Sequence, residues 1–380
     1  MKLHFLGSGS CCPTTRRGVS SMAMQIEDGS VWLFDCGEGS QIQIQKLPVS
    51  AAKINKIFIT HLHGDHLFGL PGLLCTISQQ LDIKEEDKQN NKMPIIEIYG
   101  PLGLRLFLFT SLSLSRSPLA YQYKVHELVP HNAQYGEDWD SWNVDHNGPE
   151  HLHPSELPPV ILSYIENEDG HVYWKLFESG DWSVNAGWIH HRVPSFGFVL
   201  KEKGRQGTID KDKLISLGIK PGPLYGILKS GHSINVDGVG EVTPEMVLGP
   251  SYPGRTAVVL GDTNDATPLA HLVDKCDVLV HEATHDDALG EKASEFGHST
   301  PSQAAAFAKC INANVLLLNH FSQRYKPISQ EMNELADDDE SVAILEAQAK
   351  NVLQSTNIQV LCADDLFIYP VPKVSRLTTK

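Results

Sequence analysis

Short apolar runs rich in β-branched residues recur along the chain, and helical patterns separate many of them. Strands are predicted at 3–6, 20–26, 31–34, 53–59, 95–98, 256–260, 277–280 and 315–318. Helices are predicted to begin near residues 70, 102, 301 and 341. A strand pair is expected around Val360 and Phe367. Strands that alternate with helices throughout a chain indicate an α/β sandwich.

The stretch His61-Leu62-His63-Gly64-Asp65-His66 follows the predicted strand at 53–59. A strand with this ending delivers three imidazoles and a carboxylate to one rim of a sheet, and Gly64 lets the backbone turn between them. Imidazole nitrogen and carboxylate oxygen are ligands that suit zinc, and also manganese or iron(II). The stretch therefore predicts a metal site.

Other polar side chains also lie at the ends of predicted strands. Carboxylates occur at Asp262 and Glu282, and an imidazole follows a strand at His320. A further histidine is needed if two metals are bound, and His191 is preferred to its neighbour His190. Asp35 follows the strand at 31–34 and is expected to orient a metal-bound histidine rather than to bind the metal.

His298 lies just ahead of a predicted helix start. Thr300 and Gln303 have the spacing of a capping box, and Pro301 fits the first helical turn. The N-terminus of a helix favours an anionic phosphate, so His298 is placed where a phosphate could bind.

Two other segments predict no chemistry. The run Gly7-Ser8-Gly9-Ser10 lacks the Lys-Ser/Thr of a P-loop and predicts a tight turn. Residues 131–170 contain nine acidic residues and no Lys or Arg, which predicts an irregular acidic insertion on the surface. Histidines within it, at 146, 151 and 153, are not expected to bind metal.

The chain has 380 residues, 41% of them hydrophobic, and a formal net charge of −15. This charge, if evenly spread, would argue against nucleic acid or an anionic membrane as a partner. Seven scattered cysteines without a Cys-x-x-Cys pair indicate reduced thiols in an intracellular protein. The first residues do not have the pattern of a signal peptide, and no apolar run approaches membrane-spanning length. A cytoplasmic location is expected, with access to the nucleus left open.

The charge is not evenly spread. Residues 201–230 contain seven basic and three acidic residues, a local charge of +4. The basic residues are Lys201, Lys203, Arg205, Lys211, Lys213, Lys220 and Lys229. A run of charge usually marks a solvated face, but its sign here opposes that of the molecule, which favours contacts with phosphates.

Taken together, the strand-end residues resemble the ligand set of the metallo-β-lactamase fold, an αββα sandwich with two metals between its sheets. The finer motifs resemble one branch of it, short-form tRNase Z. The matching stretches are 5–9, 34–39, 61–74, 221–226, 260–263, 281–284, 298–300 and 320–325. The resemblance runs from residue 1 to about 370. The acidic stretch 131–170 does not correspond to any functional part of this family.

The resemblance implies a single four-layer domain over 1–380 that cleaves the 3′ trailer from precursor tRNA and leaves a 3′-hydroxyl. It implies two zinc ions per chain, one held by His61, His63 and His191, the other by Asp65, His66 and His320, with Asp262 bridging. Asp65 would also orient the attacking water, and His298, steered by Glu282, would protonate the leaving oxygen. Residues 201–253 would form an inserted flexible arm that grips the tRNA from the partner subunit of a homodimer. Arg324, which follows the last ligand in the sequence, is expected to contact the substrate, as are the seven basic residues between 201 and 229.

Two other functions remain open from the sequence. One is a small-molecule hydrolase of the same fold, such as a thioester hydrolase or cyclic-nucleotide phosphodiesterase, for which the basic segment would be superfluous. The other is an RNA-binding subunit without catalysis, which the intact set of predicted ligands disfavours.

Overall fold

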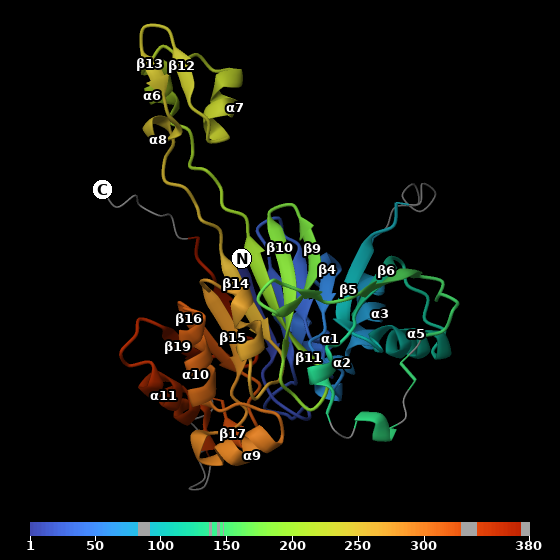
Figure 1. Cartoon of the computed structure of the whole chain (residues 1–380). Coiled ribbons are helices and arrows are strands. Elements are labelled where there is room, and N and C mark those ends of the chain that lie inside the picture. Colours follow the sequence, from blue (N-terminus) through green and yellow to red (C-terminus); the bar gives the residue numbers. More distant parts are fainter. Residues whose placement is uncertain (83–91, 137–138, 143–144, 147, 328–339, 374–380) are drawn as a thin grey trace. The chain divides into compact units, whose positions relative to one another are not determined.

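A computed structural model describes residues 1–82, 92–136, 139–142, 145–146, 148–327 and 340–373 (Figure 1). The chain divides into two compact units. The first comprises residues 1–177, 184–200 and 257–371, and the second comprises 178–183, 201–256 and 372–380. The segment predicted as an arm, 201–253, lies within the second unit.

One eight-stranded sheet is built mainly from the N-terminal part of the chain, in the order β20-β1-β2-β3-β4-β5-β6-β7. Its strands are β1 (Lys2–Gly7), β2 (Ser21–Gln25), β3 (Val31–Phe34), β4 (Ile54–Phe58), β5 (Ile95–Pro101), β6 (Gln122–Leu128), β7 (Glu156–Leu162) and β20 (Ile368–Pro370). Strands β3 to β7 are parallel to one another, so their carboxyl ends meet at one edge.

The other eight-stranded sheet has the order β19-β16-β15-β14-β11-β10-β9-β8. Its strands are β8 (Ile165–Glu166), β9 (Val172–Ser179), β10 (Trp182–Ile189), β11 (Ser195–Glu202), β14 (Thr256–Leu260), β15 (Val278–Glu282), β16 (Val315–Asn319) and β19 (Gln359–Cys362). The four strands β14, β15, β16 and β19 are parallel and almost wholly apolar, as strands covered on both faces must be.

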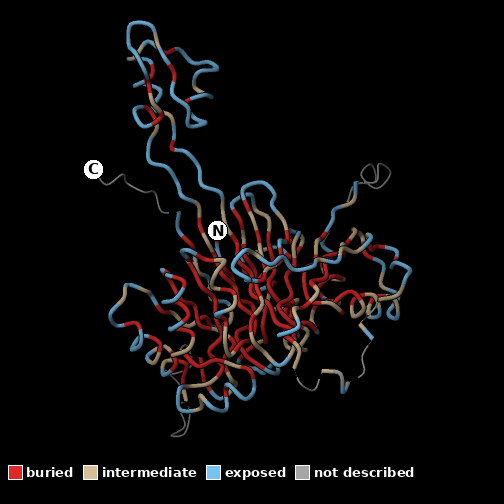
Figure 2. The backbone as a smooth tube through the Cα atoms, in the orientation of Figure 1, coloured by how far each residue is buried: buried red, intermediate tan, exposed pale blue. Residues whose placement is uncertain are grey.

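Aromatic side chains join the inner faces of the two sheets. The Phe58 ring on β4 lies 5.3 Å from the Phe198 ring on β11, and Phe34 on β3 lies 6.1 Å from the same ring. The buried residues of the first unit form the red centre of Figure 2.

Helices cover the outer face of each sheet, as Figure 1 shows. Helices α3 (Leu70–Gln80) and α5 (Leu104–Leu114) place leucines in the core of the first sheet. Helices α10 (Pro301–Cys310) and α11 (Val342–Val352) pack on the second. The resulting order of helix, sheet, sheet and helix confirms the predicted αββα sandwich.

Local sequence explains where these helices begin. In α3 the apolar residues Leu70, Leu73, Leu74 and Ile77 recur at helical spacing and are all buried, and a proline occupies the first turn. Helix α10 begins at the predicted capping box, in which the Thr300 backbone N–H donates to Gln303 Oε1 at 2.8 Å.

Shorter elements complete the first unit. They are α1 (Ser40–Gln43), α2 (Gly64–Leu67), α9 (Gly290–Glu295) and the strand pair β17 (Tyr325–Lys326) and β18 (Glu340–Ser341). Within the described residues, no helix is both long enough and apolar enough to cross a membrane.

The second unit has its own small core. It contains α6 (Lys211–Ser216), α7 (Pro223–Lys229), α8 (Pro244–Val247) and the hairpin of β12 (Ile234–Val236) and β13 (Gly240–Val242). The core is a cluster of six buried hydrophobic residues, Leu214, Ile219, Leu228, Ile234, Val242 and Val247.

Two expectations about local structure need correction. The strands near Val360 and Phe367 do not pair with each other, because β19 joins the second sheet and β20 the first. The acidic stretch 131–170 is not irregular throughout, since it contains β7 and β8. It is also not wholly on the surface, since Gln134, His153 and Glu156 are buried. Of this stretch, 137–138, 143–144 and 147 lie outside the described residues.

Candidate metal centre and active site

The seven predicted ligands come from the carboxyl ends of strands in both sheets. His61 and His63 follow β4, and Asp65 and His66 lie in the short helix α2. In the second sheet, His191 lies between β10 and β11, Asp262 follows β14 and His320 follows β16. The backbone of His320 has a positive φ of 55°, an uncommon conformation for a residue other than glycine.

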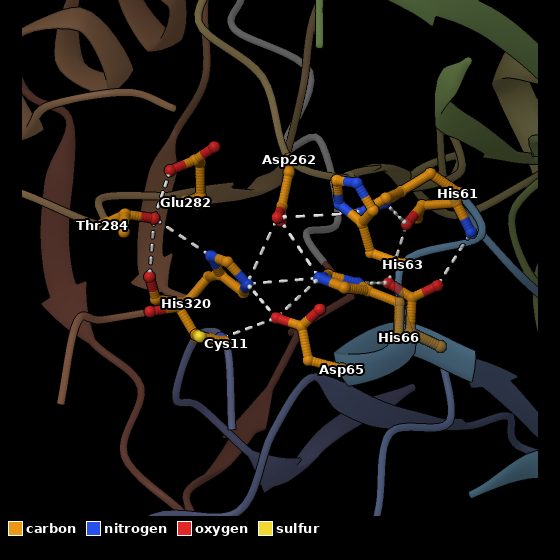
Figure 3. Close-up of polar contacts among 12 residues, drawn as sticks. Cys11, His61, His63, Asp65, His66, Asp262, Glu282, Thr284 and His320 are labelled. Atoms are coloured by element: carbon orange, nitrogen blue, oxygen red, sulfur yellow. Dashed lines mark hydrogen bonds and ion pairs between the residues drawn. The ribbon is translucent and has the colours of Figure 1, made fainter. Parts of the chain in front are cut away.

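The structure brings these side chains together in two overlapping groups (Figure 3). One group is His61, His63, His191 and Asp262, and the other is Asp65, His66, Asp262 and His320. Within each group the ligand atoms lie within 4.8 Å of one another.

Asp262 belongs to both groups and faces both sets of imidazoles. Its Oδ2 lies 3.7 Å from His61 Nε2 and 3.3 Å from His320 Nε2. Its Oδ1 lies 3.3 Å from His66 Nε2. One buried carboxylate is therefore positioned between two candidate cation sites.

Polar groups outside the cluster hold the outer nitrogen of four of the imidazoles. The pairs are His66 Nδ1 with Asp35 Oδ2 at 2.7 Å, His191 Nδ1 with the Gly297 carbonyl at 2.7 Å, His61 Nδ1 with Thr60 Oγ1 at 3.0 Å, and His320 Nδ1 with Thr284 Oγ1 at 3.0 Å. These contacts fix the ring orientation and leave Nε2 facing the cluster. Asp35 thus contacts a histidine from outside the ligand set, as its position after β3 suggested.

His63 is oriented differently from the other four. Its Nδ1 lies 3.1 Å from His61 Nε2 and 3.2 Å from His191 Nε2, so Nδ1 is the nitrogen that faces the first group.

The electrostatics of the first group suit a metal ligand set. Burial lowers the pKa of His61 and His63, and it lowers the pKa of His191 to about 4. The imidazoles are therefore neutral near pH 7, which is the form that binds a metal.

In the second group, positive charge is needed to balance the carboxylates. Burial alone would lower the pKa of His66, but Asp262 and Asp35 raise it well above its usual value. Burial alone would raise the pKa of Asp262, but His320 and His66 hold it low. A cation bound here would replace the proton on His66 as the balancing charge. The donor atoms and the charge of the cluster therefore fit zinc.

His298 and Glu282 form an acid–base pair beside this cluster. His298 Nδ1 lies 3.0 Å from Glu282 Oε1, which also accepts a hydrogen bond of 2.7 Å from the Thr263 backbone N–H. Burial would lower the pKa of His298, but the Glu282 carboxylate raises it to about 9. Because Nδ1 is engaged by Glu282, Nε2 is the nitrogen that can reach a substrate.

A cleft of about 640 Å3 opens over both groups. Its walls include His63, Asp65, His191, Asp262, His298 and His320, so five of the seven predicted ligands and the candidate acid are accessible to a substrate. His61 and His66 lie beneath and are fully buried.

Several residues of the site were not predicted from the sequence. They are Thr60, Thr284 and Cys11, whose backbone N–H donates to Asp65 Oδ2 at 2.7 Å. Thr60 directly precedes the metal motif and Thr284 ends the run that contains Glu282, so their proximity in sequence was the available signal. Glycine also contributes, because a Cβ on Gly37 would clash with the Asp65 carbonyl oxygen.

The remaining predicted residues do not belong to the two ligand groups. The His190 ring lies 4.8 Å from the Trp188 ring, and His190 is not in either ligand group. Arg324 is exposed and lies 4.0 Å from Glu340. The seven basic residues between 201 and 229 belong to the second unit.

Comparisons with known proteins show which family this chain belongs to. Human zinc phosphodiesterase ELAC protein 1 is 42% identical over 98% of this chain and 99% of its own length. Ribonuclease Z of Pediococcus pentosaceus is 38% identical over 86% of this chain and 89% of its own. The chain belongs to the ribonuclease Z family.

Solved structures agree with membership of the ribonuclease Z family. The crystal structure of human tRNase Z, short form (ELAC1), matches with a TM-score of 0.64 and 32% identity, covering 98% of this chain and all of that one. The metallo-β-lactamase fold protein YhfI of Bacillus subtilis matches with a TM-score of 0.52 and 15% identity, covering 97% and 98%. The fold is therefore the metallo-β-lactamase fold. The family model for anti-Pycsar protein Apyc1 matches residues 1–88 alone.

Proposed function

We propose that this member of the ribonuclease Z family is a zinc-dependent endoribonuclease that cleaves the 3′ trailer from precursor tRNA and leaves a 3′-hydroxyl on the tRNA. Its relatives are a zinc phosphodiesterase, ribonuclease Z and tRNase Z. The observation that carries the proposal is the position of Asp262 between two groups of histidines, because a pair of cations can act on both oxygens of a displacement at phosphorus.

In this proposal each chain holds two zinc ions. His61, His63 and His191 would hold one, Asp65, His66 and His320 the other, and Asp262 would serve both. Bound zinc would supply positive charge beside the scissile phosphate and make a nearby water more acidic. The open cleft above the clusters leaves room for the phosphodiester.

Asp65 is proposed to orient the attacking water. Its Oδ2 accepts a hydrogen bond from the Cys11 backbone N–H and lies 3.4 Å from His320 Nε2. The pKa of Asp65, which burial would raise, is held low by His66 and His320, so this carboxylate is ionised and can accept a hydrogen bond from the attacking water.

His298 is proposed to protonate the leaving 3′ oxygen of the tRNA. An alkoxide is a poor leaving group, so cleavage of RNA needs a proton donor. Glu282 holds the Nδ1 side of the ring and favours the charged imidazolium, so the proton to be transferred is on Nε2.

The basic segment of the second unit is proposed to bind tRNA phosphates. Lys211, Lys213, Lys220 and Lys229 are exposed, and within the described part of the chain none of the four forms an ion pair with a carboxylate. Exposed and unpaired lysines can approach phosphates without first breaking an ion pair. Lys203 and Arg205 differ, because Glu178 and Asp181 already pair with them.

The proposal also includes a homodimer, in which this segment grips a tRNA bound to the partner subunit, and a cytoplasmic location with nuclear access open. The seven free thiols of the structure support a reducing compartment.

The test is an assay of the purified protein on a precursor tRNA with a 3′ extension. We expect one cut at the start of the trailer, with a 3′-hydroxyl on the tRNA and a 5′-phosphate on the trailer. An enzyme that leaves this RNA intact but hydrolyses small phosphodiesters or thioesters would be a small-molecule hydrolase instead.

A further inference from the structure

A cavity of about 150 Å3 lies beside the metal cluster in the first unit. Aromatic and apolar side chains dominate its lining, among them Leu62, Tyr135, Trp139, His146 and Val193. A cavity of this volume in another protein takes up benzene, so this one has room for about one aromatic ring.

Three aromatic side chains of this cavity come from the acidic stretch 131–170. Trp139 stacks on His146, with ring centroids 5.3 Å apart and an angle of 15° between the planes. Tyr135 packs against Trp139 at 5.0 Å. This stretch, whose composition predicts no chemistry, thus contributes a stacked aromatic group.

The backbone on both sides of this aromatic group is fixed by buried polar side chains. Gln134 is 3% exposed, and its Nε2 donates a hydrogen bond of 2.8 Å to the Ser195 carbonyl at the start of β11. Arg105, 6% exposed, donates to the carbonyls of Pro149 and His151 at 2.8 and 3.1 Å. The cavity wall is therefore attached to β11 of the second sheet and to helix α5, which covers the first sheet.

The cavity adjoins the active-site cleft at one shared residue. His63 lines the cavity and also lines the cleft above the metal ligands. A nucleotide whose phosphate lies at the ligand cluster would therefore have its base within reach of this cavity.

The chemistry of the lining favours a base over a phosphate. Among the described residues that line the cavity there is no Lys or Arg. Aromatic side chains, in contrast, stack on any base, and unpaired RNA ends are recognised in this way.

We propose that this cavity binds the base of a nucleotide next to the scissile phosphate, with Trp139 and Tyr135 as the stacking residues. This inference rests on the proposed function, because it requires an RNA substrate. The base belongs either to the last nucleotide of the tRNA or to the first nucleotide of the trailer, and both offer the same planar surface.

The test is a cycle that combines a protein change with an RNA change. Precursor tRNAs are made with an abasic ribose at one of the two positions, and each is cleaved by the parent and by Trp139→Ala. KM is measured, together with equilibrium binding of the same RNAs in the presence of a chelator. Tyr173→Ala is the matched control, since Tyr173 on β9 packs near His271 and does not line the cavity.

For one of the two positions, we expect the abasic ribose to raise KM and Kd for the parent by roughly 5- to 100-fold. With intact RNA, Trp139→Ala should raise KM and Kd by a similar factor. When Trp139→Ala is combined with the abasic RNA, KM and Kd should rise little beyond the value for either change alone. Trp139→Phe should retain most of the binding. In Tyr173→Ala, the abasic ribose should raise KM and Kd by the same factor as in the parent.

The inference is overturned if the effects of Trp139→Ala and of the abasic ribose on KM multiply at both RNA positions. It is also overturned if neither Trp139→Ala nor the abasic ribose affects KM. Melting temperatures identify a misfolded variant, in which case Leu102→Trp, which fills the cavity from another wall, takes the place of Trp139→Ala and should give the same loss. A parent enzyme that leaves intact precursor tRNA uncut contradicts the proposed function instead, so the two failures can be told apart.

Discussion

The ligand cluster of the first unit and the basic segment 201–256 of the second differ in how firmly their side chains are held. In the cluster, His61 and Asp262 are 0% and 2% exposed, and four of the imidazoles have a hydrogen-bond partner outside the cluster. In the basic segment, lysines such as Lys211 and Lys213 are exposed on a unit whose core has six buried hydrophobic residues.

This difference matches what each region is proposed to do. A metal site and a proton donor require distances fixed to a fraction of an ångström, and buried hydrogen bonds provide that. Contacts to phosphates need positive charge and reach, and long solvated side chains provide both without a fixed geometry. Changes in the first region should therefore stop the chemistry, and changes in the second should weaken binding of RNA.

The largest effect is expected for Asp262→Asn. The substitution keeps the size of the side chain but removes the charge that faces both ligand groups, so turnover should fall below detection and metal content should fall with it. Measurements are cleavage of precursor tRNA and metal content per chain. Asp265→Asn, three residues later and outside both groups, is the control. A fully active, metal-free Asp262→Asn enzyme would contradict the two-metal assignment.

A smaller but selective effect is expected for His298→Ala. General acid catalysis contributes about 100- to 10,000-fold, so cleavage of RNA should slow by this factor. Hydrolysis of a nitrophenyl phosphodiester should slow much less, because its leaving group needs no proton. His190→Ala is the matched control. Equal losses on both substrates would instead assign His298 a role in positioning.

Replacement of residues 202–252 by a short Gly/Ser linker should weaken the binding of precursor tRNA and leave the chemical step intact. We expect KM for precursor tRNA to rise roughly 100-fold, because several phosphate contacts are lost together. The small phosphodiester should still be hydrolysed, since the residues that line the cleft over the cluster all belong to the first unit. If the shortened enzyme cut precursor tRNA as well as the parent, the segment would have no role in gripping tRNA.

The smallest effects are expected for Lys211→Glu and Lys213→Glu. Each should lower the slope of log Kd against log salt concentration by nearly one unit if its lysine contacts a phosphate. Binding is measured at several salt concentrations, with Lys309→Glu on α10 as an exposed control in the first unit. An unchanged slope in both variants would leave these lysines as solvated surface.

The same contrast explains what could be predicted from the sequence. Strands such as β3 and β14 carry their own signal, because an apolar run that ends in an aspartate needs no distant information. Candidate ligands such as His61, Asp262 and His320, which follow apolar strands, could be named for the same reason. Their partners Thr60 and Thr284 could not, because a threonine hydroxyl acquires its role when two strand ends meet.

Predictions failed where the tertiary structure decided the outcome. The strand near Phe367 joins β1, which is more than 350 residues away in the sequence, and no local pattern indicates that pairing. In 131–170, acidic composition concealed the buried anchor Gln134 and the aromatic side chains of the cavity.

The central claim, that this cluster holds two metals at which precursor tRNA is cut, is tested most directly by stepwise reconstitution. The enzyme is stripped with a chelator, zinc is added back, and cleavage of precursor tRNA is followed against zinc bound per chain. We expect no cleavage without metal and a full return of activity that saturates at two zinc ions per chain. Cleavage that persists in the stripped enzyme, or activity that saturates at one ion, would contradict the claim.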